Sequence, residues 1–189
     1  MPADDDGLMA QIRQHDEAAF AELVRRHLDP LHRYLFRLTG SADDAEDLAQ
    51  ETFLRVWQRA ASYRPGVVRL TTWLHRIAHN MAVDSLRRTR PEPLADDDDM
   101  AGLADDGADP ARAASSAEFE RHLDHAIGIL PANQRAALLL CQVQGFANRD
   151  AAAIMGVSVR GLESLLARAR RSLRLAMAAR VPMSALERS

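Results

Sequence analysis

The chain has 189 residues, of which 47% are hydrophobic, with 24 basic side chains, 27 acidic side chains and one cysteine. This length and apolar content suffice for one or two buried cores, while a single cysteine excludes a disulfide framework and a thiolate metal cluster. No stretch is long and apolar enough for a membrane span, and the acidic start "MPADDDGLMA" is unlike a signal peptide, so we expect a soluble, cytoplasmic protein.

Charge is segregated along the chain, although the formal net charge is only −3. Residues 1–60 hold seven arginines and twelve acidic residues, whereas 61–90 hold six arginines and one acidic residue. Residues 91–120 hold one arginine and ten acidic residues, and 121–189 hold ten arginines and four acidic residues. Two basic blocks thus alternate with two acidic ones. All the cations are arginines, which indicates either a GC-rich genome or a preference for the planar guanidinium that suits phosphate.

The most acidic part includes "PEPLADDDDMAGLADDGADPARAASS", residues 91–116. It is rich in Pro, Gly, Ala and Asp and has no apolar periodicity, so it is predicted to be an extended, self-repelling linker. On both sides of it the apolar spacing is helical and almost nothing indicates a strand. We therefore predict an all-α protein with two small helical domains, 1–90 and 117–189, joined by a flexible acidic linker.

Two helical segments are predicted before residue 60. An apolar stripe runs through residues 17–38, which form one or two helices ended by Gly40. Ser41 then caps a helix over 42–60, where aspartates occupy the first turn. Its outer face is polar and surrounds Leu54 and Trp57, and the polar residues are Glu46, Asp47, Gln50, Glu51 and Gln58. An apolar centre with a polar rim is typical of a binding surface, and an isolated exposed leucine is the alternative.

The segment "SYRPGVVRL", residues 62–70, is a loop because it contains Pro65 and Gly66. Tyr63, Arg64 and Arg69 lie along this loop, just before the next helix. An aromatic ring, cations and an adaptable backbone favour a pocket for an unstacked base.

The helix "TTWLHRIAHNMAVDSLRR", residues 71–88, has two distinct faces. Its inner stripe is apolar and comprises Leu74, Ile77, Ala78, Met81 and Ser85. A second stripe, predicted to face outward, holds Arg76, Asn80 and Arg87 and is flanked by Trp73 and His79. Cations for phosphate, an amide for a base edge and an aromatic plane for stacking indicate nucleic-acid binding. The alternative is a solvated face with one half-buried tryptophan.

The second domain is predicted to contain a helix-turn-helix. After amphipathic residues 119–130 and a helix started by Pro131, Asn148 caps a short helix over 149–155, Gly156 makes the turn, and Ser158 caps a longer helix. In this motif the second helix enters the major groove of DNA. Its inward side comprises Leu162, Leu165, Leu166, Ala169 and Leu173, and its outward side Arg160, Ser164, Arg168 and Arg171. A solvated arginine face is the alternative.

We expect no metal, no cofactor and no enzymatic activity. His75 and His79 have the i, i+4 spacing of two metal ligands, yet no acid or cysteine accompanies them. Cys141, within "RAALLLCQV", has the surroundings of a small buried hydrophobe. No phosphate-binding glycine loop, nucleophile elbow or Ser-His-Asp spacing is present.

Four segments together resemble a known family. "DAEDLAQETFLRVW", "TTWLHRIAHNMAVDSLRR", "LPANQRAALLL" and "GVSVRGLESLLARARRSLR" are similar to the region-two and region-four motifs of bacterial extracytoplasmic-function (ECF) sigma factors. The likeness runs in order from Ala19 to Met177, with a linker where the family has one.

The resemblance implies a non-catalytic specificity subunit of RNA polymerase. The contact with the clamp helices of the largest polymerase subunit would be made by Asp47, Gln50, Glu51, Leu54 and Trp57. The set that recognises and melts the minus-ten promoter element would be Tyr63, Arg64, Trp73, Arg76, His79, Asn80, Arg87 and Arg88. The minus-thirty-five element would be read by Arg160, Ser164, Arg168 and Arg171, in a domain that also meets the polymerase flap. The linker would pass near the RNA path, and an anti-sigma factor would hold the protein inactive.

The chain departs from the family pattern in the helix-turn-helix. Glu-Ile-Ala is replaced by residues 150–152, Asp-Ala-Ala, and Thr-Val-Lys-Ser-Arg by residues 161–165, Gly-Leu-Glu-Ser-Leu. Two cations are lost there, and Glu163 would repel phosphate although it can accept a hydrogen bond from cytosine. Two other hypotheses are a sigma-like module that only binds a regulator and an ordinary helix-turn-helix repressor, which would leave Leu54 and Trp57 unused.

Overall fold

The computed structural model describes residues 4–89 and 116–178, which are helical apart from short turns and loops and contain no strand. The all-α prediction is therefore confirmed. The predicted acidic linker lies outside the described residues except for Ser116. Within the described ranges, no helix combines the length and the apolar character that crossing a bilayer requires.

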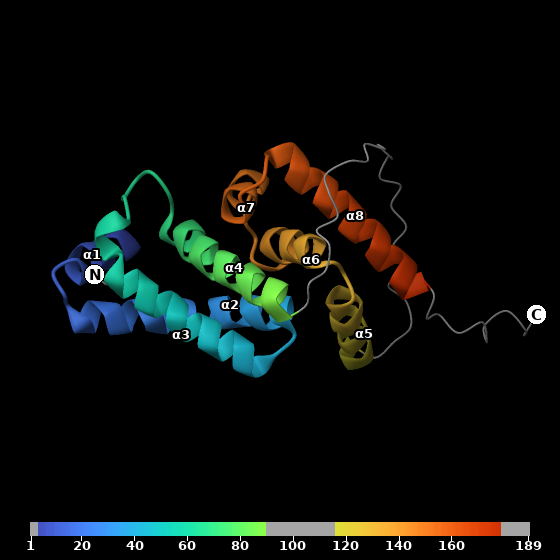
Figure 1. The fold of residues 1–189 in the computed structure, drawn as a ribbon, viewed down its shortest axis with the longest axis horizontal. Coiled ribbons are helices and arrows are strands. Elements are labelled where there is room, and N and C mark those ends of the chain that lie inside the picture. Colours follow the sequence, from blue (N-terminus) through green and yellow to red (C-terminus); the bar gives the residue numbers. More distant parts are fainter. Residues whose placement is uncertain (1–3, 90–115, 179–189) are drawn as a thin grey trace, which may run out of the picture.

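The helices form an N-terminal group and a C-terminal group (Figure 1). The N-terminal group contains α1 (Asp5–Ile12), α2 (Glu17–Thr39), α3 (Ala42–Gln58), a 3₁₀ turn (Ala60–Ser62) and α4 (Leu70–Thr89). The C-terminal group contains α5 (Ser116–Gly128), α6 (Ala132–Leu138), a π-helical turn (Leu139–Val143), α7 (Asn148–Met155) and α8 (Val159–Ala178).

Helix α2 is a single helix, and it packs against α1, α3 and α4. The Asp16 carboxylate caps it by accepting hydrogen bonds from the backbone N–H groups of Ala18 and Ala19. It continues through Pro30 and ends where predicted, at Gly40, whose φ of 76° is the left-handed conformation that glycine tolerates best.

Helix α1 was not predicted. The Asp4 carboxylate caps it by accepting from the backbone N–H of Gly7 at 2.8 Å. Its apolar side buries Leu8, Met9 and Ile12, which join the core of the N-terminal group. The capping aspartate followed by these spaced apolar residues is a readable helix signal, although the acidic run also fits a solvated terminus.

Helices α3 and α4 complete the N-terminal core. Ser41 caps α3 as predicted, because its hydroxyl accepts from the backbone N–H of Asp44 at 3.2 Å. On α4 the predicted inner residues Leu74, Ala78 and Met81 are buried. The other two residues of the predicted stripe, Ile77 and Ser85, are only partly buried, so the stripe is confirmed in part.

The helix-turn-helix is present in the C-terminal group. Gly156 makes the turn with φ 69°, and the Ser158 hydroxyl accepts from the backbone N–H of Gly161 at 3.0 Å, which confirms Ser158 as the cap of α8. The predicted cap of α7 is wrong, because Ala147 is the capping residue and Asn148 lies inside the helix. The Asn148 amide oxygen instead lies 3.8 Å from the half-buried Cys141 Sγ.

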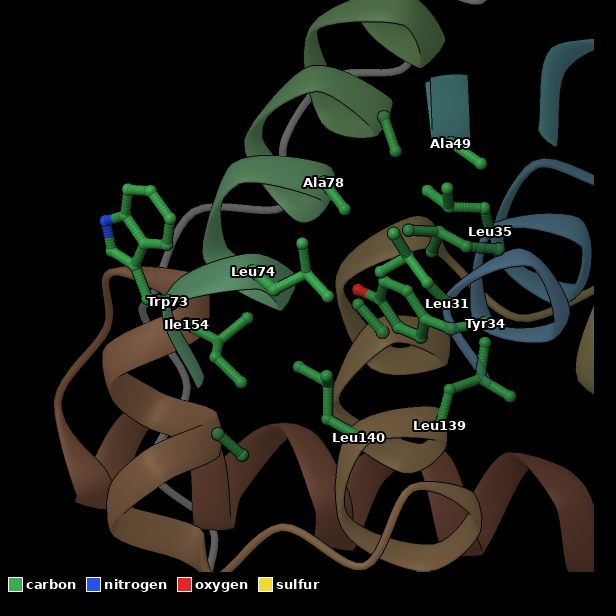
Figure 2. Close-up of a cluster of buried hydrophobic side chains, with 14 of the residues drawn as sticks. Leu31, Tyr34, Leu35, Ala49, Trp73, Leu74, Ala78, Leu139, Leu140 and Ile154 are labelled. Carbon is green, nitrogen blue, oxygen red and sulfur yellow. The ribbon is translucent and has the colours of Figure 1, made fainter. Parts of the chain in front are cut away.

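The two groups pack against each other through an interface formed by α2 and α4 on one side and α5, α6, the π-helical turn and α7 on the other. Figure 2 shows Leu139 and Leu140 beside Leu31 and Tyr34, with Ile154 near Leu74. We call this contact the inter-group interface.

Polar bonds also cross the inter-group interface. The buried Arg135 guanidinium donates to the Leu38 carbonyl at 2.8 Å, and also to the carbonyls of Gly128 and Leu130 in its own group. Gln144 Nε2 donates to the Pro30 carbonyl at 3.1 Å. The buried residues of both groups therefore form one continuous core.

Candidate protein and nucleic-acid interfaces

The outer face of α3 carries the predicted protein-binding residues, and we call it the α3 face: Asp47, Gln50, Glu51, Leu54 and Trp57. Leu54 is 47% exposed, and the acidic and amide side chains around it are exposed or half-buried. Trp57 is half-buried, because its ring meets the edge of the Phe20 ring at a centroid distance of 5.0 Å. The exposed apolar centre of this face is therefore Leu54, while Trp57 packs partly against the core.

The outer side of α4 carries the predicted cations, and we call it the α4 face: Arg76, Asn80, Arg87 and Arg88. All four side chains are exposed, and Arg64 on the preceding loop is exposed too. A shallow pocket of about 350 Å³ between α3 and α4 is lined by both faces, through Asp47, Glu51 and Arg88 among others. The two faces therefore meet along the line where these helices pack.

The predicted outward position of Trp73 and His79 is wrong. Trp73 is only 7% exposed, and its ring lies 5.4 Å from that of Tyr63, which is 1% exposed beneath the loop. Helical spacing places a residue at an angle around the axis, but it does not say how far the neighbouring elements extend around that helix. The loop and α2 extend far enough to cover both flanks of the predicted outer stripe.

Both histidines of α4 are buried and uncharged. His79 Nδ1 lies 2.9 Å from the Tyr34 hydroxyl, and burial lowers the pKa of His79 to about 4. Burial likewise lowers the pKa of His75 to about 4, and its Nδ1–H donates to the Thr71 carbonyl at 2.9 Å. A neutral, buried His79 offers no charge to a phosphate. The described residues include no group of three or more His, Cys, Asp or Glu able to hold a metal ion.

Helix α8 presents the predicted DNA-reading side chains. Arg160, Ser164 and Arg171 are exposed, while Arg168 is half-buried and its Nε lies 3.4 Å from the Ser164 carbonyl. Leu165, at a position where the family has an arginine, belongs to the buried stripe with Leu162, Leu166 and Ala169. Glu163 is exposed on the outer side.

Sequence reasoning missed the contribution of α1 to the loop before α4. The Asp6 carboxylate accepts a hydrogen bond from the Tyr63 hydroxyl at 2.6 Å. The Arg13 guanidinium donates to the backbone carbonyls of Ala60 and Tyr63. An open pocket of about 700 Å³ lies between α1, Arg26 and this loop. Contacts between residues more than 45 positions apart leave no local pattern in the sequence.

Two family matches coincide with the two helical groups. Residues 23–92 match Sigma-70 region 2, and residues 121–173 match Sigma-70, region 4. The region 2 match covers most of α2 together with α3 and α4, and the region 4 match contains the helix-turn-helix. These two regions joined in one chain define a sigma factor of the sigma-70 type.

Curated relatives make the assignment narrower. The chain is 37% identical over 165 residues to the ECF RNA polymerase sigma factor SigE of Mycolicibacterium smegmatis, spanning 84% of this chain and 63% of that protein. It is 36% identical over 170 residues to the ECF RNA polymerase sigma factor SigM of Mycobacterium tuberculosis, spanning 89% of this chain and 82% of that protein. The chain therefore belongs to the ECF RNA polymerase sigma factors of the sigma-70 family.

Solved structures agree with this family. CnrH in complex with the cytosolic domain of CnrY is 26% identical, with a TM-score of 0.67, over 92% of this chain and 96% of that chain. The sigma factor RpoE in complex with the anti-sigma factor NepR from Bartonella quintana is 26% identical, with a TM-score of 0.64, over 84% of this chain and 96% of that chain.

Proposed function

We propose that this ECF sigma factor binds core RNA polymerase through the α3 face and promoter DNA through the α4 face, the adjoining loop and α8. One observation supports this division more than any other. An acidic face around an exposed leucine and a cationic face with an exposed asparagine lie on neighbouring helices of one packed core. Their opposite charges favour two different partners, a protein on α3 and nucleic acid on α4.

The α3 face has the make-up of an interaction hot spot. Leu54 offers apolar area that loses water on binding, and Asp47, Gln50 and Glu51 form a rim that can pair with basic groups. In this proposal the rim carboxylates steer the polymerase clamp helices, and Leu54 supplies most of the affinity. Trp57 acts by holding the α3 face in shape through its packing on Phe20.

The α4 face is proposed to bind the minus-ten element. Arg76, Arg87 and Arg88 would contact phosphates, and the Asn80 amide would read a base edge. Arg64 would join them from the loop. Opening the duplex needs no catalysis, because binding energy that favours an unpaired, flipped base over a stacked one shifts the equilibrium. The buried Tyr63, Trp73 and His79 would support this surface from beneath.

Helix α8 is proposed to contact the minus-thirty-five element. Arg160, Arg168 and Arg171 would neutralise phosphates, and Ser164 would face the groove. Position 165, where this chain has leucine in place of the arginine of the family pattern, lies on the buried side of α8. The change therefore leaves the exposed side of α8 unaltered. The exposed Glu163 is the remaining departure from the family pattern on α8. We expect its carboxylate to favour a cytosine in the DNA base pair that it contacts.

Regulation by an anti-sigma factor is part of the proposal. RpoE, which shares 26% identity and most of its length with this chain, was solved with the anti-sigma factor NepR. We also propose that the protein acts by binding alone and catalyses no reaction. Its proposed location is the cytoplasm, where core polymerase and the chromosome lie.

Run-off transcription with purified core polymerase on genomic fragments tests the proposal. The parent chain should direct specific transcripts, and Leu54→Asp should abolish both core binding and transcription. Leu28→Asp is the matched control, because Leu28 is an exposed leucine on α2 outside the α3 face, and its replacement should leave core binding unchanged. Absence of core binding by the parent chain would overturn the proposal.

A second pair of variants separates DNA binding from polymerase binding. Asn80→Ala should retain core affinity but lose transcription from double-stranded promoters, because its amide is the base-reading group of the α4 face. Arg33→Ala, an exposed change on α2 outside both faces, should behave as the parent. Normal transcription by the Asn80→Ala chain would contradict the proposed role of Asn80 in DNA recognition.

A further inference from the structure

The loop between the 3₁₀ turn and α4, residues 63–69, has few contacts of its own. Gly66 adopts a left-handed φ of 75°, and Val67 at the tip is 79% exposed. A turn hydrogen bond joins the Val67 N–H to the Arg64 carbonyl at 3.3 Å. A segment with so little internal packing takes its shape from the points that hold its ends.

Helix α1 supplies those points. At the start of the loop, Arg13 Nε donates to the Ala60 carbonyl at 3.1 Å and the same guanidinium donates to the Tyr63 carbonyl. Beneath the loop, the Tyr63 hydroxyl donates to Asp6 Oδ1 at 2.6 Å and lies 3.2 Å from the Val68 carbonyl near the other end. Asp6 on α1 and Arg13 at its C-cap therefore hold the start of the loop with charge-assisted hydrogen bonds, and the Tyr63 hydroxyl held by Asp6 lies against the other end.

The anchoring of α1 itself does not depend on Asp6. Asp4 caps the helix, and Asp5 pairs with His27 Nε2 at 3.0 Å and with Arg26 at 3.4 Å on α2. The apolar side of α1 is buried in the core. Three consecutive aspartates thus have three separate partners, and the partner of Asp6 is the loop.

The fastened loop connects directly to the α4 face. The Tyr63 ring packs at 5.4 Å from Trp73 in the first turn of α4, and Arg76 and Asn80 follow on the next turns of the same helix. The position of Tyr63 therefore sets where Arg64 stands relative to Arg76 and Asn80. A surface held in one arrangement before binding loses less conformational entropy when it captures a base.

We propose that Asp6 on α1 and Arg13 at the C-cap of α1, both of which precede the matched region 2, are positioning residues for promoter melting. This inference rests on the proposed function of the loop and the α4 face. Releasing the loop would leave polymerase binding intact and would slow the opening of the duplex. Asp6 would act through Tyr63 and would not touch the DNA.

The test compares Asp6→Ala with Asp6→Asn and with Asp29→Ala. Asparagine keeps an oxygen that can accept the Tyr63 hydrogen bond, and Asp29→Ala removes the same charge from an exposed site on α2. The measurements are core-polymerase affinity, permanganate reactivity of unpaired thymines on a duplex promoter, and run-off transcription from duplex and pre-melted versions of that promoter. The promoter is one obtained by run-off transcription of genomic fragments with the parent chain.

We expect Asp6→Ala to slow opening of the duplex promoter about tenfold, the size of effect that loss of a hydrogen bond to a charged group produces. Transcription from the pre-melted promoter and core affinity should stay within about twofold of the parent, since neither step needs strand opening. Asp6→Asn should recover most of the opening rate, and Asp29→Ala should match the parent. Arg13→Ala, which releases the start of the loop, should reproduce the Asp6→Ala pattern.

Two results would overturn the inference. One is an Asp6→Ala chain that opens the duplex at the parental rate. The other is an equal loss on duplex and pre-melted templates, which would indicate a general structural role. Failure of the proposed function can be told apart from failure of this inference, because in that case the parent chain itself would not bind core polymerase or transcribe the pre-melted promoter. The inference would then fail as well.

Discussion

His75 and His79 show how burial fixes the charge of a side chain. Both lie on α4 within the core, and water is replaced there by Tyr34, whose ring centroid is 5.5 Å from that of His75 and whose hydroxyl is 2.9 Å from His79 Nδ1. Removing an imidazolium from water costs more than removing an imidazole, so burial lowers the pKa of each to about 4. Near neutral pH, both imidazoles are therefore uncharged in the folded protein.

This charge state predicts a pH dependence of stability. Each folded-state pKa of about 4 lies below the reference value of 6.5, so the unfolded chain takes up protons first as the pH falls. The free energy of unfolding should be constant above pH 6.5 and should fall toward pH 4, by on the order of 2–3 kcal/mol per histidine. Urea unfolding between pH 4 and 7 measures this fall, and imidazole signals of His75 and His79 that titrate near pH 6.5 in the folded protein would contradict it.

The N-terminal aspartates show what sequence reading misses at this scale. From the sequence alone, the run of three acids indicates only that the N-terminus is unlike a signal peptide. In the structure Asp4 caps α1, Asp5 pairs with α2 and Asp6 accepts from Tyr63. The cap could have been read from local spacing. The other two contacts could not, since their partners are set by how distant segments pack.

At the scale of the element, helix ends were the best predicted features. Ser41 and Ser158 cap the helices for which they were predicted, and Gly40 and Gly156 end theirs, because each signal acts within one turn of its own residue. Faces were less predictable. Three of the five residues predicted on the apolar stripe of α4 are buried, but the coverage of Trp73 by the loop depends on an element that carries no helical period.

The cap of α8 leads to a stability prediction. Ser158→Ala removes the oxygen that accepts from the Gly161 N–H, so the free energy of unfolding should fall by about 1 kcal/mol. Ser164→Ala, the same change at an exposed position within α8, should alter it by less than about 0.5 kcal/mol. Thermal and urea unfolding of the three chains give the comparison, and equal stabilities for both variants would show that the cap contributes nothing.

The α4 face leads to a prediction about salt. If Arg76 neutralises one phosphate, Arg76→Ala should lower the slope of log affinity against log salt concentration by about 1, uniformly across promoter sequences. Arg33→Ala on α2 removes an equally charged, exposed side chain and should leave the slope unchanged. Promoter affinity of the polymerase complex, measured over a range of salt concentrations, tests the assignment. If the slope for Arg76→Ala equals that of the parent, the proposed contact between Arg76 and a phosphate is wrong.

For the whole molecule, the sequence predicts two helical units, and the two family matches coincide with them. It does not predict how the units meet. Leu139 and Leu140 occupy ordinary core positions in the sequence pattern, yet they pack beside Leu31 and Tyr34 of the other unit. An apolar stripe shows only that a side is buried, and the pattern is the same whichever element covers it.

Arg135 makes a buried hydrogen bond across the inter-group interface, and its contribution to the free energy of unfolding can be measured. Arg135→Met keeps an unbranched, largely apolar stem but removes the guanidinium, which leaves the carbonyls of Leu38, Gly128 and Leu130 without this donor. We expect a loss of about 2–4 kcal/mol in the free energy of unfolding, because buried acceptors without partners are costly.

Arg149→Met is the matched control, since Arg149 is exposed on α7 and its loss should cost less than about 0.5 kcal/mol. Urea unfolding monitored by tryptophan fluorescence and by helical circular dichroism follows both variants. A chain with Arg135→Met that unfolds at the parental urea concentration would show that this buried guanidinium adds no stability.

The packing of α7 on α4 also bears on promoter architecture. While that contact is closed, the span between the cations of α4 and those of α8 is set by packed side chains, whatever the length of the acidic segment that joins the two units. Promoters whose two recognition elements are separated by a different length of DNA would be bound only after the contact opens. The free energy needed for opening would then appear as weaker binding, so the chain would select promoters by the spacing of their elements as well as by their bases.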